Sequence, residues 1–316
     1  MRKLVLFCLL VSGLLPGYAA AADCMKGDAV FKTLKPQSVP FKDYEIRLYS
    51  QPDCEAEPES HIAGLQILKE GKQVYVQTGY SFALGYPLEQ DQPPDSVKPA
   101  LGMDFTGEGI PELLISEWSG GAHCCYSFHL FRLGETFSKI QSIPVLDADE
   151  SAFVRRPGVK GLVLVTADYG AFAYFPSSFA GSPAGRVLLS FQDGRFRPDA
   201  TLMKTTAPKS DETSKCAALF KPSRDWKGRD NDGQPLGMWY YATDLIYTGN
   251  ETQAWAFLGA AWGGNAADKK KYLDEYRARL KKSVYYPELE SLQKAPFSNA
   301  DQRIDWTKQC FEYLQD

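Results

Sequence analysis

Two of the three histidines of this chain flank a pair of adjacent cysteines: His123, Cys124, Cys125 and His129. Thiolate and imidazole groups suit zinc and copper, so the cluster is a candidate soft-metal or redox site. A strand that begins at Cys125, however, would place Cys125 and His129 on one face and point Cys124 to the other. An oxidising compartment also favours a disulfide over free thiolates. We therefore expect a disulfide here and keep metal binding as the alternative.

A second group of residues could supply oxygen ligands to a metal ion. Asp104, Thr106, Glu108, Ile110 and Glu112 occupy alternate positions of one glycine-containing segment. Calcium takes roughly six to eight oxygen ligands, and the three carboxylates could contribute to such a shell. Thr106 in place of a further acid and the long side chain of Glu108 weaken it.

Residues 104–113, Asp-Phe-Thr-Gly-Glu-Gly-Ile-Pro-Glu-Leu, resemble the loop and following strand of FG-GAP (VCBS-type) β-propeller repeats. That family has acidic residues at alternate loop positions and a glycine where this chain has Gly109. The resemblance implies propeller-type repeats, a calcium-binding loop and a role in adhesion or protein–protein contact. Calcium ligation by the five residues at alternate positions, Asp104 to Glu112, is what this resemblance implies, and calcium is the one cofactor that we expect. The following segment, which includes Gly120 to Cys125, is similar to a motif of exported bacterial proteins of unsettled function.

The elements that would position these residues have a β pattern up to about residue 200. Short apolar runs alternate with turn residues, which is typical of strands. We predict strands over residues 44–49, 62–68, 73–77, 113–117, 126–133, 162–166, 187–191 and 195–197. Glu70-Gly71 and Asp193-Gly194 have the composition of tight hairpin turns.

Two blocks of strand, long loop, strand, turn and strand repeat at residues 110–140 and 159–197, and the hairpin at 62–77 could belong to an earlier block. Repeated antiparallel units of this length are typical of propeller blades or a repeated β-sandwich. Three blocks are too few to close an ordinary propeller. We therefore expect a β-rich N-terminal domain that is a partial β-propeller or a compact repeat sandwich.

After residue 200 the pattern changes to helices. Residues 236–248, 251–262, 268–283 and 304–314 have helical spacing, and Gly249-Asn250 is a helix stop. Residues 249–261 resemble one tetratricopeptide helical hairpin, but a single repeat makes no solenoid, so we favour an ordinary hairpin. We expect a β-repeat domain at 23–200, a linker at 201–235 and a small α-helical domain at 236–316.

Five aromatic side chains crowd the long loop inside the second block: Tyr169, Phe172, Tyr174, Phe175 and Phe179. Packing in the core is the favoured interpretation. The alternative is an exposed contact surface for a protein or a sugar, because aromatic residues are enriched in binding patches.

Residues 1–22 have a basic start, a short apolar run and small residues at the end, which is typical of a secretory signal peptide. No later stretch is long and apolar enough to predict a transmembrane segment. We therefore expect an exported chain, in the periplasm or secreted. Cys8 leaves with the signal peptide, and an even number of cysteines in an exported chain implies disulfides. Their order suggests the pairs Cys24–Cys54, Cys124–Cys125 and Cys216–Cys310, while other pairings stay open.

The formal net charge is −4, and loss of Arg2 and Lys3 with the signal peptide makes it −6. A mildly acidic chain without a basic block is a poor nucleic-acid binder. The sequence has no serine-hydrolase elbow, phosphate loop or His-Glu-x-x-His motif. We expect a non-enzymatic protein that binds another protein. The alternatives are an immunity or inhibitor protein that neutralises a periplasmic toxin or hydrolase, and a metal-binding or redox protein that uses the His/Cys cluster.

Overall fold

The structure, a computed structural model, describes residues 25–51, 62–87, 95–121, 125–146, 151–220, 235–263, 266–297 and 303–314. The expected signal peptide lies outside the described residues, and so do Cys24, Cys54, His123 and Cys124. Within the described ranges, no helix has the length and apolar character needed to span a bilayer.

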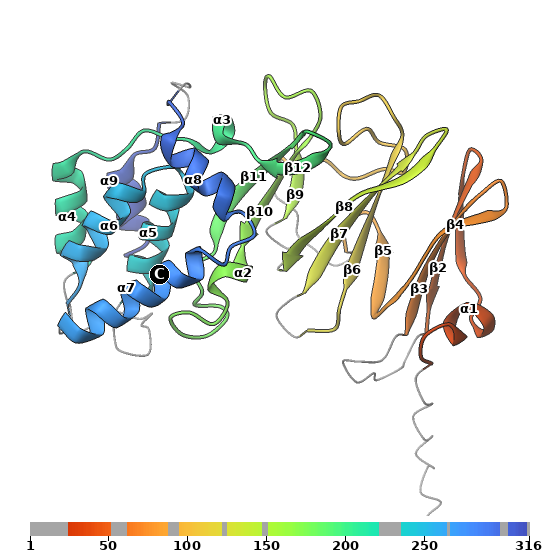
Figure 1. The fold of residues 1–316 in the computed structure, drawn as a ribbon, viewed down its shortest axis with the longest axis horizontal. Helices are drawn as coiled ribbons and strands as arrows, with labels where there is room; N and C mark the ends of the chain where they lie inside the picture. The colour runs from red at the N-terminus through yellow and green to blue at the C-terminus, as the bar shows by residue number, and fades with distance from the viewer. Residues whose placement is uncertain are drawn as a thin grey trace, which may run out of the picture.

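The first part of the described chain forms three antiparallel sheets of four strands each (Figure 1). The first sheet contains β1 (Gln37–Phe41), β2 (Tyr44–Ser50), β3 (Ala63–Lys69) and β4 (Lys72–Gly79). The second contains β5 (Ser81–Leu84), β6 (Glu112–Trp118), β7 (Tyr126–Leu133) and β8 (Phe137–Leu146). The third contains β9 (Ala152–Val154), β10 (Val163–Asp168), β11 (Gly185–Gln192) and β12 (Arg195–Pro198). Neighbouring strands in each sheet are consecutive in the chain, so every sheet is a simple meander.

Tight turns fix the register of two of these meanders. Glu70 and Gly71 join β3 to β4 with φ angles of +49° and +75°, and Asp193 and Gly194 join β11 to β12 with +50° and +80°. Positive φ at both central residues is the type I′ geometry that suits the twist of a hairpin. Both predicted hairpins are therefore confirmed, and the predicted strand 126–133 has the bounds of β7.

The three sheets are stacked face to face, with most of the helices beyond the third sheet (Figure 1). A small core fills the space between the first and second sheets: Tyr44, Ile46, Leu65, Ile67, Leu113, Ile115, Phe131 and Leu133. The other face of the second sheet belongs to a larger core that continues through the third sheet into the helices. The second sheet is therefore covered on both faces.

The outer face of the first sheet carries polar pairs beside the exposed Val74 and Val76 of β4, and Phe31 packs on Tyr49 there. Arg47 donates two hydrogen bonds to the Glu45 carboxylate, at 2.9 and 2.8 Å. Gln66 accepts a hydrogen bond from the Tyr49 hydroxyl at 3.0 Å and donates one to Gln73 at 2.7 Å. Units at the end of a stacked array need a largely polar outer face for solubility, and these hydrogen bonds supply part of it.

The described helices follow the third sheet, except for two short ones. They are α1 (Ala29–Thr33), α2 (Tyr169–Phe172), α3 (Ala200–Met203), α4 (Ser210–Phe220), α5 (Leu236–Tyr247), α6 (Glu251–Ala261), α7 (Ala266–Leu280), α8 (Tyr286–Lys294) and α9 (Trp306–Glu312). Gly249 ends α5 with a φ of +79°, and the Asn250 N–H donates to Leu245 O at 2.7 Å. This left-handed C-terminal cap makes α5 and α6 the predicted helical hairpin.

The first part of the segment that the sequence predicts as a linker, residues 201–235, contains helix. It contributes most of α3 and all of α4, and the side chains of Thr213, Cys216, Ala217 and Phe220 are buried. They lie on one face of α4 because their spacing follows the helical period. The polar residues between these positions make the short apolar stripe hard to recognise in the sequence. Residues 221–234 of the predicted linker lie outside the described ranges.

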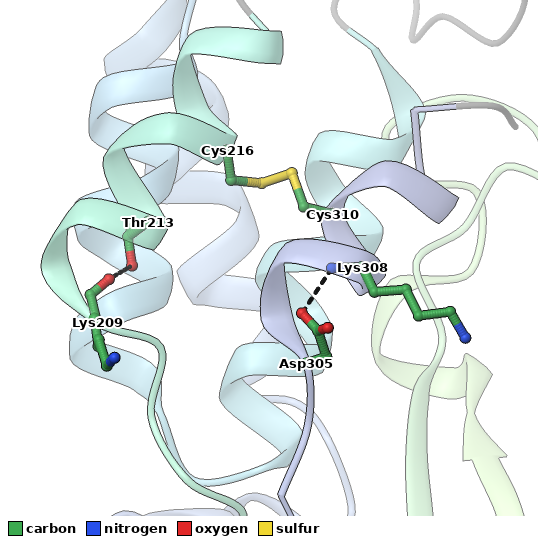
Figure 2. The surroundings of a disulfide bond; sticks show 6 residues. All are labelled: Lys209, Thr213, Cys216, Asp305, Lys308 and Cys310. Carbon is green, nitrogen blue, oxygen red and sulfur yellow. Dashed lines mark hydrogen bonds between the residues drawn. A yellow bond between two sulfur atoms is a disulfide. The ribbon is translucent and has the colours of Figure 1, made fainter.

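A disulfide ties the two ends of this helical part together. Cys216 on α4 is bonded to Cys310 on α9; their Cα atoms are 5.9 Å apart and the two residues are separated by 94 in sequence number (Figure 2). Asp305 caps α9 by accepting a hydrogen bond from Lys308 N at 3.0 Å. This is the pair that cysteine order predicted. The helices nevertheless share one hydrophobic cluster with the third sheet, so the β and α parts are not separate in their packing.

Candidate functional site

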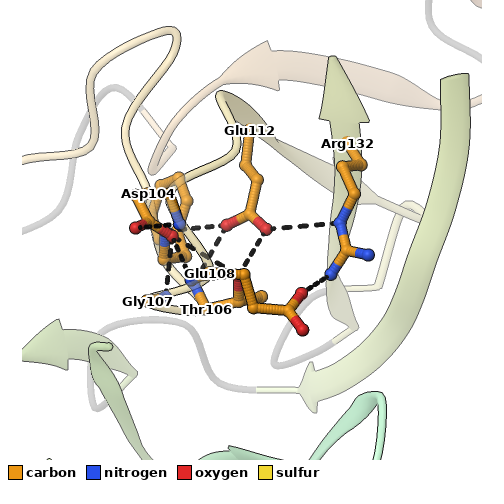
Figure 3. Close-up of polar contacts among 8 residues, drawn as sticks. Asp104, Thr106, Gly107, Glu108, Glu112 and Arg132 are labelled. Atoms are coloured by element: carbon orange, nitrogen blue, oxygen red, sulfur yellow. Dashed lines mark hydrogen bonds and ion pairs between the residues drawn. The ribbon is translucent and has the colours of Figure 1, made fainter. Parts of the chain in front are cut away.

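The loop at residues 104–112 closes on itself through Asp104 (Figure 3). The Asp104 carboxylate accepts hydrogen bonds from the backbone N–H groups of Gly107, Glu108 and Gly109, at 2.7, 3.1 and 2.8 Å. Gly107 and Gly109 have φ angles of +79° and +78°, which glycine adopts at little cost. Asp104 therefore serves as the acceptor for the amides of its own loop.

Glu112, at the start of β6, is fully buried and holds the other side of the loop. Its carboxylate accepts hydrogen bonds from Phe105 N at 2.7 Å, Thr106 N at 3.0 Å and the Thr106 hydroxyl at 2.7 Å. Burial raises the pKa of Glu112, and these hydrogen bonds oppose that rise. Arg132 on β7 lies opposite, with its Nε 3.8 Å from Glu112 Oε1, and its Nη2 forms an ion pair with Glu108.

These contacts do not fit a calcium shell. The Thr106 hydroxyl faces Glu112, Glu108 is paired with Arg132, and Ile110 is half-buried. The Arg132 guanidinium already supplies a positive charge beside the two glutamates. Within the part of the chain that the structure describes, no three His, Cys, Asp or Glu side chains are grouped so as to hold a metal. Calcium binding stays a prediction, while the geometry favours a loop closed by hydrogen bonds and Arg132.

The same loop is locked against the loop that precedes β10. Phe105 O accepts a hydrogen bond from Leu162 N at 2.8 Å. Gly107 and Gly161 leave no room for side chains: a Cβ on Gly107 would lie 2.6 Å from Gly161 N, and one on Gly161 2.5 Å from Phe105 O. The two loops therefore form one rigid unit that bridges the second and third sheets.

His129, on β7, lies at the interface of the first and second sheets and is buried. Its Nε2 is 2.6 Å from Glu117 Oε2, and its Nδ1 is 2.8 Å from Ser142 Oγ. Glu117 also accepts a hydrogen bond from Gln77 of the first sheet, at 2.9 Å. Hydroxyl, imidazole and carboxylate in series are the parts of an activated nucleophile. None of the hollows described below is lined by these residues, so we interpret them as a structural network that joins the two sheets.

Cys125, which precedes β7, is disulfide-bonded. Cys216 and Cys310 are bonded to each other, so the partner of Cys125 lies outside the described residues. Both ring nitrogens of His129 already contact other side chains, and Cys125 is not a free thiolate. The described half of the His/Cys cluster therefore gives no support to a metal or redox site, and His123 and Cys124 lie outside the described ranges.

The crowded aromatic loop belongs mostly to the core. Phe172 stacks on Tyr276 of α7, with ring centroids 4.8 Å apart, and Phe175 contacts Trp239 of α5 at 5.1 Å. Tyr174 differs, because its side chain is 66% exposed. The loop therefore anchors the helices on the third sheet and presents a single large aromatic side chain to solvent.

Several surface hollows lie along residues 198–207, which connect β12 to α4. The loop groove has a volume of about 990 Å³ and lies between the locked loops and the β11–β12 hairpin. It is lined by Thr106, Glu108, Pro157, Gly158, Val159, Lys160, Gly161, Ser190, Phe191, Gln192, Asp193, Gly194, Asp199, Thr201 and Leu202. The junction cavity has a volume of about 520 Å³ and lies between the third sheet and the helices. It is lined by Arg156, Pro157, Arg186, Leu188, Leu202, Met203, Thr205, Asp244, Tyr247, Thr248, Ile304 and Gln309.

Asp244, on α5, is the acidic group of the junction cavity. The Tyr313 hydroxyl donates to its Oδ2, and Gln309 Nε2 lies 3.4 Å from the same oxygen. Burial raises the pKa of Asp244 to about 6, and the Tyr313 hydrogen bond and the charge of Arg186 oppose this shift. Perturbed carboxyl groups in a cavity are typical of functional sites.

No protein-family model, curated protein or solved structure matches this chain. The function therefore has to be argued from geometry. The sequence singled out the loop at 104–112, which does line the loop groove, but it gave no signal for the junction cavity. The residues of that cavity come from five separate segments between positions 156 and 309, and only tertiary packing brings them together.

Proposed function

We propose that this chain is an exported, non-enzymatic binding protein that holds a segment of another protein in the loop groove. The groove itself carries the proposal, because it is formed by two loops that are locked together before any partner arrives. A preorganised site loses less conformational entropy on binding. The Cys216–Cys310 disulfide supports export, since disulfides persist mainly in oxidising compartments.

The charges of the groove favour an acidic partner segment. Asp193 is paired with Arg197 at 3.0 Å, and Asp199 accepts hydrogen bonds from Ser190 and Thr201. Lys160 is exposed and has no ion pair among the described residues. The acidic groups are thus engaged within the chain while the ammonium group is available, so a carboxylate of the partner would complete the site.

The propeller interpretation belongs to the same proposal. Three consecutive four-stranded meanders, stacked face to face, have the strand order of propeller blades. We infer an open array of three such blades, with binding loops between strands, as the resemblance of residues 104–113 to FG-GAP repeats implies. An immunity or inhibitor protein would be the same function with a toxin or hydrolase as the partner.

Site-specific photo-crosslinking in the source organism tests the proposal. A photoreactive residue at position 160 should form an adduct with one protein, while the same residue in place of exposed Gln37 on β1 should not. The isolated partner should bind the chain, and Lys160→Glu should weaken this binding at least tenfold. Lys215→Glu, on the exposed face of α4, is the matched control and should bind normally. Equal adducts from positions 160 and 37, or unchanged binding by Lys160→Glu, would overturn the proposal.

A further inference from the structure

We propose that the junction cavity is a second binding site, for a small organic anion whose apolar body lies inside the cavity and whose carboxylate or phosphate group faces Arg186 and Arg156. This cavity adjoins the loop groove, with which it shares Pro157 and Leu202, but Arg156, Arg186 and Asp244 line the junction cavity alone. Ligand sites commonly occur where two structural parts meet, in hollows of roughly 300–1,000 Å³. At about 520 Å³, the junction cavity has that size and lies between the third sheet and the helices.

Arg186 carries the recognition of the anion. It lies on β11, its side chain is exposed, and it has no hydrogen bond or ion pair among the described residues. The positive charge of Arg186 nevertheless acts to lower the pKa of both Asp95 and Asp244, so Arg186 is near both acids. A guanidinium group offers a planar fork of N–H donors that matches a carboxylate or a phosphate. The exposed guanidinium group of Arg186 can therefore donate hydrogen bonds to an anion in the cavity.

Arg156 adds a second guanidinium to the same rim. Its Nη1 donates to Asp95 Oδ2 at 3.0 Å and to Arg155 O at 3.2 Å, from the loop between β9 and β10. These contacts orient the guanidinium group. The other nitrogens make no hydrogen bond within the described residues and can donate to a ligand. Because Asp95 already holds Arg156, the guanidinium of Arg186 is the main contact left for an anion, and the remaining nitrogens of Arg156 add to it.

The other lining residues of the cavity select the rest of the ligand. Leu188, Leu202, Met203 and Ile304 supply apolar surface from three different segments. An inorganic ion would leave this surface uncovered, so the ligand needs an apolar body. Asp244 carries the opposite charge to the rim and would repel a second anionic group. The anionic end of the ligand therefore faces the arginines, and an uncharged or hydrogen-bond-donating end faces Asp244.

Calorimetry with four probes tests this assignment on the full exported chain. The probes are phenylacetate, phenyl phosphate, inorganic phosphate and benzyl alcohol. We expect one of the two aromatic anions to bind with a dissociation constant below about 1 mM. Preference between them distinguishes a carboxylate from a phosphate ligand. Inorganic phosphate should bind at least tenfold more weakly because it has no apolar body, and benzyl alcohol because it has no charge.

Arg186→Gln should weaken binding of the preferred anion at least tenfold. Folding should be unaffected, because the side chain is exposed and has no partner among the described residues. Arg195→Gln is the matched control: Arg195 is an exposed arginine of the same sheet that pairs with Glu288 outside the cavity. It should bind the anion normally. The proposal is overturned if neither aromatic anion binds below about 1 mM, or if both variants bind like the wild type.

Discussion

Arg132 puts a permanent positive charge beside Glu108 and Glu112, where the sequence predicted calcium. We therefore expect the melting temperature of the purified chain to be the same in calcium and in EDTA. Arg132→Gln should lower the free energy of unfolding by about 1–3 kcal/mol, because the buried Glu112 carboxylate loses its nearby charge. Thermal and urea unfolding measure both effects. A rise of several degrees in calcium would contradict this interpretation and restore the cation site.

Asp244 makes a prediction about pH. Its pKa is raised from 3.8 to about 6 in the folded chain, so the folded state binds the proton more tightly than the unfolded state. The contribution of Asp244 to stability is therefore complete below about pH 4 and is lost as the pH rises through 6. Asp244→Asn should remove a fall of up to about 3 kcal/mol over this range. Urea unfolding at pH 4, 5, 6 and 7 measures it, with Asp193→Asn on an exposed hairpin as the control.

His129 makes a third prediction at this scale. If Ser142, His129 and Glu117 are only a structural network, a fluorophosphonate probe should not label Ser142. His129→Ala should cost about 1–3 kcal/mol, because it leaves the partly buried Glu117 without its closest partner. Labelling that disappears in Ser142→Ala would show that the hydroxyl is an activated nucleophile, and the chain would then have to be reconsidered as a hydrolase.

At the scale of elements, the disulfide between α4 and α9 constrains a long stretch of chain. Cross-links over such a separation remove much conformational entropy from the unfolded state. Replacing both Cys216 and Cys310 by alanine should lower the free energy of unfolding by about 3–5 kcal/mol. Ser214→Ala, on the exposed side of α4, should change it little. Urea unfolding under non-reducing conditions compares the three chains, and equal stabilities would contradict the expectation.

The locked loops make a second prediction about elements. Gly161→Ala would push a Cβ into the backbone of Phe105 and Thr106, so the two loops must separate. We expect a cost of about 2–3 kcal/mol and loss of partner binding in the loop groove. Gly158→Ala is the matched control in the same loop, because its Cβ would meet open space and only its φ of +78° is unfavourable. It should cost about 1 kcal/mol and keep the groove.

The sequence predicted some strands and missed others because their local patterns differ in strength. The strands with clear apolar runs and Asp-Gly or Glu-Gly turns were predicted nearly at their bounds, because burial and turn geometry act locally. The strands β1, β5 and β9 were missed, and β8 was anticipated only to residue 140, as the third strand of the first block. The three missed strands have five residues or fewer, which is too short for a clear alternating pattern, whereas the equally short β12 was found from its Asp-Gly turn. For the same reason α4 was read as a linker: its apolar stripe is brief and its partners are distant in sequence.

At the scale of the whole molecule, the site depends on the order in which the layers are stacked. The loop groove needs the second sheet against the third, and the junction cavity needs the third sheet against the helices. Both contacts belong to the larger hydrophobic cluster, which includes aromatic side chains from every layer but the first. Of these two clusters, the first sheet contributes only to the smaller one. The two proposed binding surfaces thus lie in the part of the molecule with the larger core.

This division predicts unequal stability along the stack. A unit that touches one neighbour through a small core opens at a lower free energy than the units behind it. In native-state hydrogen exchange, amides of β2 and β3 should exchange at least tenfold faster than those of β10 and α5. Ile46→Ala, in the smaller core, should speed exchange in the first sheet while leaving α5 unchanged, because a buried isoleucine contributes about 2–5 kcal/mol locally. Exchange at one common rate in all layers would mean that the stack unfolds as a single unit, and the first sheet would then be as essential to the groove and the cavity as the layers that line them.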